Sequence, residues 1–195
     1  MVKKEKVLFL DFDGPLFSDR MVKFHPDNTY NNKGVTHIRE LVREMSPLVA
    51  NSVDYAHMDP ASVNMLNRLQ DQYGFLTVIS SSWKHFLSKA GICDLFNIND
   101  LLLPLHDSWV TPKGKAGNRL GDIHDWFEEN GGIDKYDWIA IDDPISGGNI
   151  ADQYIVEGYL GEDTFKRCII VDPEVGLTTH DYKDICRIWN STKTS

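Results

Sequence analysis

Short runs of consecutive hydrophobic residues recur along the chain, and each ends at a polar or acidic residue. The clearest runs cover 7–10, 75–79, 138–141 and 168–171. Strands that are buried on both faces show such continuous runs, because no alternate position faces water. A fifth run at 101–105 contains Pro104, a residue that central strands avoid. The pattern predicts four buried strands and one less regular strand.

Helical periodicity fills the stretches between these runs. The expected helices cover 35–45, 60–73, 83–90, 120–127 and 178–189. Asp59 followed by Pro60 is a favourable helix start, and Gly74 is a favourable end. Thr178 with Asp181 resembles a capping box. Strands that alternate with helices predict an α/β fold, a three-layer, Rossmann-like and mostly parallel sheet.

The segment 17–58 interrupts this alternation with a polar, mixed composition. We interpret it as a small cap insertion after the first strand, and assign the core to 1–16 and 59–195. Phe24 and Tyr30 in the insertion are candidates to stack on a nucleobase or sugar of a substrate. Alternatively, these aromatic residues form the small core of the insertion itself.

Charge and cysteine content limit the possible partners and location. The 195 residues carry 20 basic and 29 acidic side chains, a formal net charge of −9, which argues against broad binding to a nucleic-acid duplex. The three cysteines form no CxxC pair, as expected for reduced thiols in the cytoplasm. The first hydrophobic run is too short for a signal peptide or a membrane span.

Acidic residues follow three of the predicted strands: Asp172 stands after the run at 168–171, and two other strands are followed by a pair. Asp11 and Asp13 stand after the first strand, and Asp142 and Asp143 stand after the run at 138–141. Carboxyl ends of parallel strands meet at one edge of a sheet, where ligands bind. Close carboxylates repel each other unless a cation neutralises them, and Mg²⁺ prefers such oxygen ligands. We therefore expect these four residues to bind Mg²⁺; the alternative is a solvated acidic turn after each strand.

Residues that could bind a phosphate follow the second strand. Ser80 can offer its hydroxyl and Ser81 its backbone N–H, while Lys84 is a further candidate for substrate binding. Ser82 is expected to cap the helix at 83–90. The serines could equally serve only as helix caps.

Phosphoryl transfer also needs fixed positive charge near the reacting group. Lys113, Lys115 and Arg119 cluster around the start of the helix that leads into the run at 138–141. We expect one of the three to reach the site. A solvated surface position is the alternative for each.

In sequence order, these residues resemble the four motifs of the haloacid dehalogenase (HAD) superfamily. The finer pattern is similar to the HAD-like domains associated with RNA-repair proteins and their phage and bacterial relatives. It includes Leu-Asp-Phe-Asp-Gly at 10–14, Ile-Ser-Ser-Ser-Trp-Lys at 79–84 and Ala-Ile-Asp-Asp at 140–143. The resemblance covers roughly residues 5–16 and 60–190.

The resemblance implies a role for each residue. Asp11 attacks phosphorus to form an aspartyl phosphate, and Asp13 protonates the leaving oxygen and then activates water. Ser80 holds a phosphate oxygen, and Arg119, or failing it Lys115, neutralises charge. Asp142, and in addition Asp143, would bind Mg²⁺ together with Asp11 and the backbone carbonyl of Asp13.

The expected function is that of a Mg²⁺-dependent phosphomonoester hydrolase acting on a nucleoside monophosphate or a similar small phosphate ester. One alternative is a 3′- or 5′-end polynucleotide phosphatase in nucleic-acid repair. Another is a catalytically idle HAD-like module that binds a phosphorylated ligand or a protein. No membrane partner is expected, and the sequence does not indicate an oligomeric state.

Overall fold

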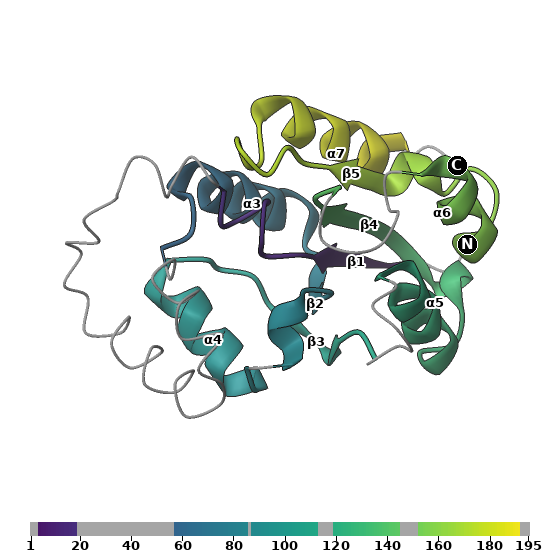
Figure 1. Ribbon diagram of the computed structural model, residues 1–195, viewed down its shortest axis with the longest axis horizontal. Coiled ribbons are helices and arrows are strands. Elements are labelled where there is room, and N and C mark those ends of the chain that lie inside the picture. Colours follow the sequence, from purple (N-terminus) through teal and green to yellow (C-terminus); the bar gives the residue numbers. More distant parts are fainter. Residues whose placement is uncertain (1–3, 19–56, 86, 113–118, 145–151, 192–195) are drawn as a thin grey trace.

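The computed structural model describes residues 4–18, 57–85, 87–112, 119–144 and 152–191 (Figure 1). The strands are β1 (Glu5–Leu10), β2 (Leu76–Ile79), β3 (Leu105–Val110), β4 (Tyr136–Asp142) and β5 (Cys168–Ile170). The helices are α3 (Pro60–Tyr73), α4 (Lys89–Ile98), α5 (Arg119–Glu129), α6 (Gln153–Leu160) and α7 (Thr179–Ser191). Short 3₁₀ turns are η2 (Ser82–His85), η3 (Ile133–Lys135) and η4 (Phe165–Arg167). The proposed insertion and its helix at 35–45 lie almost entirely outside the described residues.

The five strands form one sheet in the order β3-β2-β1-β4-β5, and every neighbouring pair is parallel. Leu10 at the end of β1 is in register with Ile79 of β2 and with Ile141 of β4. The polar residues that follow these three positions therefore meet at one edge of the sheet. The predicted α/β class and parallel sheet are confirmed.

Helices cover both faces of the sheet, as a continuous hydrophobic strand requires. On β1, Leu8 and Leu10 join the core cluster that contains residues of α3, α4 and α7. Val7 and Phe9 point the other way, into the cluster formed with α5 and α6. All four side chains are fully buried. The molecule therefore has the three layers expected from the sequence (Figure 1).

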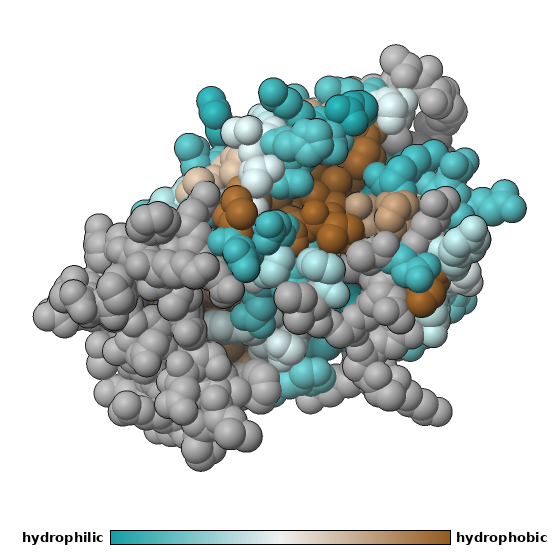
Figure 2. Space-filling model, turned by 45° about the horizontal axis from the view of Figure 1, so that its top comes forward, coloured by the Kyte–Doolittle hydropathy of each residue, from teal (hydrophilic) through white to brown (hydrophobic). Residues whose placement is uncertain are grey.

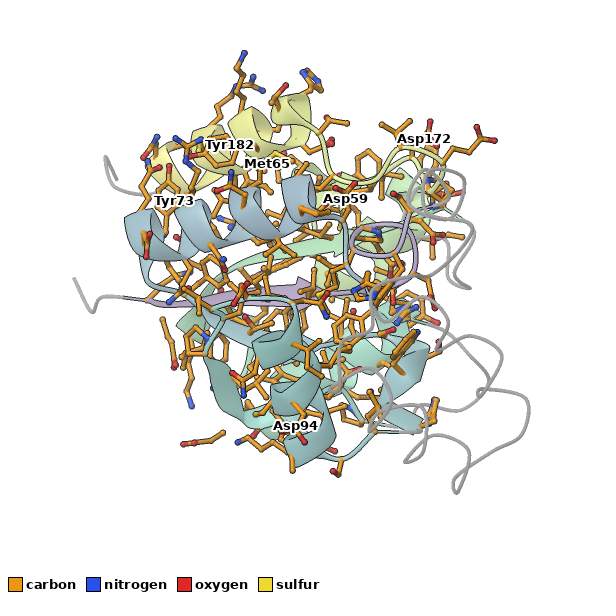
Figure 3. The ribbon with its side chains drawn as sticks, turned by 90° about the vertical axis from the view of Figure 1, so that its left-hand side faces the viewer. Asp59, Met65, Tyr73, Asp94, Asp172 and Tyr182 are labelled. Atoms are coloured by element: carbon orange, nitrogen blue, oxygen red, sulfur yellow. The ribbon has the colours of Figure 1, made fainter. Side chains whose placement is uncertain are left out.

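The predicted helix ends of α3 and α7 are confirmed. The Asp59 side chain accepts a hydrogen bond from the Ala61 amide at 2.9 Å, and Gly74 adopts a left-handed conformation with φ of 63°. At α7, the Thr178 amide and hydroxyl both donate to Asp181, at 2.8 and 2.6 Å. Figure 3 shows α3 alongside α7 on this side of the sheet.

Three details of the predicted secondary structure are wrong. The predicted helix at 83–90 is replaced by η2 and by α4. Ser88 rather than Ser82 caps the longer helix, because its side chain accepts a hydrogen bond from the Gly91 amide at 3.2 Å. The strand at 101–105 instead begins at Leu105, since Pro104 has no N–H and contributes only its carbonyl, to the Thr77 amide. Helix α6 was not expected.

The outer surface on the α7 side is mostly hydrophilic. Figure 2 shows hydrophilic side chains over the described part of this face, with a hydrophobic area between them. Among the described helices, none combines the length and the apolar character needed to cross a membrane.

Candidate active site

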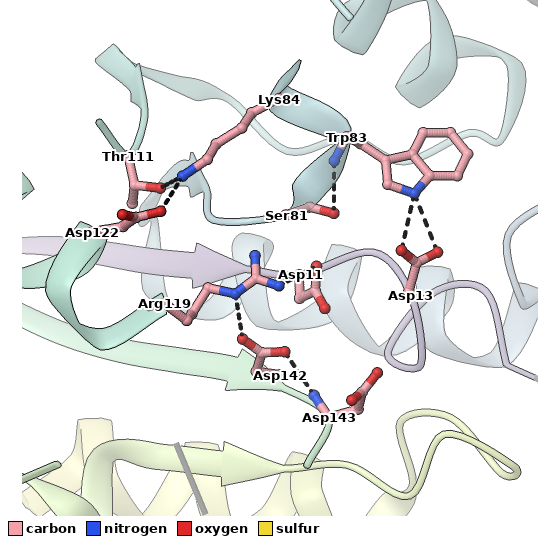
Figure 4. Close-up of polar contacts among 10 residues, drawn as sticks. All are labelled: Asp11, Asp13, Ser81, Trp83, Lys84, Thr111, Arg119, Asp122, Asp142 and Asp143. Carbon is pink, nitrogen blue, oxygen red and sulfur yellow. Dashed lines mark hydrogen bonds and ion pairs between the residues drawn. The ribbon is translucent and has the colours of Figure 1, made fainter. Parts of the chain in front are cut away.

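The ends of β1 and β4 bring two acidic pairs together. The Asp11 amide donates to the Ile141 carbonyl at 3.0 Å, which continues the β1–β4 ladder by one residue and places Asp11 beside Asp142. Both side chains are almost completely buried. These residues therefore lie together at the carboxyl edge of the sheet, as predicted (Figure 4).

Gly14 allows Asp143 to pack against the turn that follows Asp11. Its φ of +85° lies in the region that favours glycine, and a Cβ there would lie 2.8 Å from the Asp143 side chain. Asp143 itself is 5% exposed. The turn after β1 and the end of β4 are thus in direct contact, and any side chain at position 14 would separate them.

Arg119 joins the two strands electrostatically. Its Nη2 lies 3.4 Å from Asp11 Oδ1, and its Nε lies 3.0 Å from Asp142 Oδ2. The guanidinium is buried, at 7% exposure, and comes from the first residue of α5. Of the three basic candidates, Arg119 is the one that the described residues place at the carboxylates. Lys113 and Lys115 lie outside the described residues.

The site disfavours negative charge overall. Burial, followed by the negative charge of Asp11, raises the pKa of Asp142 well above its usual range, although Arg119 acts in the opposite direction. Burial and the Asp11 charge likewise raise the pKa of Asp13 to about 6. A cation or a proton entering the site would therefore be stabilised.

Asp11 has an unusual environment for a buried carboxylate. Among the described residues, no N–H group and no hydroxyl donates a hydrogen bond to its oxygens; they contact the Arg119 guanidinium and the Asp142 carboxyl group, which shares a hydrogen bond with Asp11 when it is protonated. A buried carboxylate is normally satisfied by several donors. Here its oxygens retain the capacity to contact a metal ion or to attack a substrate.

Asp13 is oriented by Trp83, a residue that the sequence analysis did not single out. The indole Nε1 donates to both carboxylate oxygens of Asp13, at 3.1 and 3.2 Å. Asp13 is thereby linked to η2 at the end of β2 (Figure 4). The sequence signal was the position of Trp83 three residues after Ser80, but nothing in the pattern indicated which way the ring points.

Ser80 and Ser81 lie at the same edge of the sheet. The Ser80 amide donates to the Leu10 carbonyl at 3.0 Å, so Ser80 follows β2 as Asp11 follows β1. Ser81 is fully buried, and its hydroxyl accepts from the Trp83 amide at 3.3 Å. Ser81, rather than Ser82, therefore caps the turn at η2.

Lys84 is held inside the protein by a buried network. Its Nζ donates to Thr111 Oγ1 at 2.7 Å, to the Pro112 carbonyl at 3.0 Å and to Asp122 Oδ2 at 2.6 Å. These contacts tie η2 to α5 through Asp122, whose partner the sequence did not reveal. The expected role of Lys84 in substrate binding stays a prediction.

The remaining predicted residues lie outside the described part of the chain. They are Lys115, Phe24 and Tyr30. Their expected roles stay predictions.

The donor set fits a magnesium ion that is completed by substrate and water. Within the ranges that the structure describes, no three His, Cys, Asp or Glu side chains are grouped so that they alone could hold a metal ion. Mg²⁺, however, typically takes only one or two carboxylates and fills its octahedral shell with water and phosphate oxygens. The Asp11 carboxylate, to which no N–H group or hydroxyl of the described residues donates, could serve as such a ligand.

One comparison with known proteins gives a match. Residues 7–182 match the family model described as HAD domain in Swiss Army Knife RNA repair proteins. No curated protein and no solved structure matches the chain. The matched range runs from β1 into α7, so it includes every site residue described above.

Proposed function

Because the chain belongs to the family of HAD domains in Swiss Army Knife RNA repair proteins, we propose that it is a Mg²⁺-dependent phosphomonoester hydrolase with Asp11 as covalent nucleophile. The family resemblance expected from the sequence is confirmed, and it indicates phosphatase-type chemistry. The observation that carries the proposal is the environment of Asp11. Its buried carboxylate accepts from no N–H group or hydroxyl of the described residues and lies between the Arg119 guanidinium and the Asp142 carboxyl group.

The first step transfers the phosphoryl group to the protein. An Asp11 oxygen forms a bond to phosphorus while the bond from phosphorus to the leaving oxygen breaks, and Asp13 gives its proton to that oxygen. We assign the Ser80 hydroxyl and the Ser81 amide to the binding of phosphate oxygens. Arg119 keeps Asp11 close to Asp142 and offsets charge during the transfer.

The second step restores the enzyme. Asp13 accepts a proton from water, the water oxygen bonds to phosphorus, and the bond from phosphorus to Asp11 breaks. Inorganic phosphate leaves, and the Asp11 carboxylate is regenerated. A carboxyl group whose pKa is raised to about 6 can both donate and accept a proton near neutral pH.

Asp11, Asp143 and the backbone carbonyl of Asp13 are the groups that we assign to the magnesium ion. Asp142 is a weaker candidate than expected, because one of its oxygens pairs with Arg119 and the other accepts from the Asp143 amide at 2.9 Å. When bound, Mg²⁺ would neutralise the phosphate and the nucleophile.

Two substrate classes are supported by different observations. The net charge of −9 favours a nucleoside monophosphate or another small ester over a long polyanion. The RNA-repair description of the family favours the phosphorylated 3′ or 5′ end of an RNA. A shared mechanism serves both classes, since each presents one phosphomonoester.

Hydrolysis assays test the proposed function directly. We expect Mg²⁺-dependent release of phosphate from p-nitrophenyl phosphate, complete loss with EDTA, and a loss of at least about 10³-fold in Asp11→Asn. Turnover of nucleoside monophosphates should then be compared with that of 3′- and 5′-phosphorylated RNA oligonucleotides. Undiminished activity in Asp11→Asn would refute the covalent mechanism. Absence of activity on every substrate would favour the idle binding module.

A further inference from the structure

Among the described residues, one side chain from another element donates a hydrogen bond to the Asp13 carboxylate. Trp83 of η2 donates one indole N–H, which is shared between the two oxygens at 3.1 and 3.2 Å. Indole is a donor only and cannot take the proton back. Because a carboxylate offers about four lone-pair positions, this shared bond leaves room on either oxygen for a proton.

The indole ring is itself fixed. Phe17 stacks on it with ring centroids 4.9 Å apart and planes 4° apart, and Phe12 contacts it edge-on at 5.8 Å. Trp83 is 5% exposed. Its backbone is held too, since its amide donates to Ser81 Oγ. Aromatic packing from the β1 turn therefore determines where the N–H points.

We propose that Trp83 is a positioning residue that fixes the Asp13 carboxyl group for proton transfer to the leaving oxygen. This inference rests on the proposed function. The hydrogen bond holds the carboxyl group on the η2 side of the turn, while Asp143 packs on the same turn at Gly14. Losing the N–H would let the carboxyl group rotate between orientations, of which few present a proton to the leaving oxygen. Small errors in such placement reduce rates strongly.

Dependence on the leaving group distinguishes this role from a purely structural one. An alkoxide must be protonated as it leaves, whereas p-nitrophenolate is stable enough to leave without a proton. The ratio kcat/KM reports the steps up to release of the leaving group, so the later attack of water does not enter it. A variant that donates the proton less well should therefore have a lower kcat/KM for alkyl phosphates but not for p-nitrophenyl phosphate.

The test is Trp83→Phe, which removes the N–H and retains an aromatic ring. We expect kcat/KM for an alkyl phosphate to fall by about tenfold or more, and kcat/KM for p-nitrophenyl phosphate to change by less than about threefold. Trp126→Phe is the matched control. Trp126 Nε1 donates to the Ser108 carbonyl at 2.8 Å, among residues that the proposed mechanism does not use, so both substrates should respond alike.

An equal loss on both substrates, or no loss on either, would overturn the positioning role. Wild-type enzyme that hydrolyses neither ester would instead refute the proposed function. The two failures are therefore distinguishable. Melting temperatures of both tryptophan variants show whether any loss reflects unfolding.

Discussion

At the scale of single residues, the site places carboxylates where ionisation is unfavourable. Asp13 and Asp142 both have raised pKa values, in each case first because of burial and then because of Asp11. Such an arrangement lowers stability unless a cation or a proton offsets the negative charge. The metal-free protein should therefore show a stability cost that depends on pH.

The raised pKa of Asp13 determines how the free energy of unfolding changes with pH. Its folded-state pKa of about 6 is higher than the ordinary value of 3.8, so the folded state binds the proton more tightly than the unfolded state. The cost is absent below the lower pKa, grows as pH rises towards 6, and is complete above it. In EDTA, Asp13→Asn should therefore stabilise the protein more at pH 7 than at pH 5, as measured by urea unfolding.

Asp137→Asn is the matched control for this prediction. Asp137 is also buried, but Lys6 and Arg167 pair with it at the opposite end of the strands. The same chemical change there should lower stability by about 2 kcal/mol, because it removes a paired charge. A stabilisation by Asp13→Asn that is equal at both pH values would contradict the raised pKa.

At the scale of elements, four strands and the N-caps of α3 and α7 agree with the sequence prediction, whereas the elements between β2 and α5 do not. Continuous hydrophobic runs located β1, β2, β4 and β5, because both faces of the sheet are covered. The region after β2 was misjudged. Three consecutive serines at 80–82 offered several possible caps, and the hydrogen bonds show that Ser81 caps η2 whereas Ser88 caps α4.

The Lys84 network shows why an ion pair between two distant elements cannot be predicted from the sequence pattern. Lys84 and Asp122 are 38 residues apart, and no periodicity relates them. Their contact joins η2 to the first turn of α5, one turn from Arg119. The network therefore connects the turn that carries Trp83 with the helix that carries the site's guanidinium.

Lys84→Met should destabilise the protein by about 3 kcal/mol, because it leaves the buried Asp122 carboxylate without its partner. The double variant Lys84→Met with Asp122→Leu should recover part of this loss, since neither buried charge then remains. Chemical denaturation measures both. A single variant within about 0.5 kcal/mol of the wild type would show that the network contributes little.

At the scale of the whole molecule, one parallel sheet explains why distant residues meet. Asp11 and Ser80 follow β1 and β2, and Asp142 is the last residue of the adjacent β4, so alignment of the hydrophobic runs was enough to predict their meeting. The orientation of side chains within the site was not predictable. The bond from Trp83 to Asp13 and the pairing of Asp142 with Arg119 depend on packing that no linear pattern encodes.

The most direct test of the account is detection of the phosphoryl group on Asp11. In Asp13→Asn the proposed activation of water is lost, so the intermediate should accumulate during turnover of p-nitrophenyl phosphate with Mg²⁺. After an acid quench, peptide mass spectrometry should find one phosphoryl group on Asp11, and none in the double variant Asp11→Asn with Asp13→Asn. A phosphoryl group on another residue, or an unmodified Asp11 in enzyme that is turning over, would contradict the account.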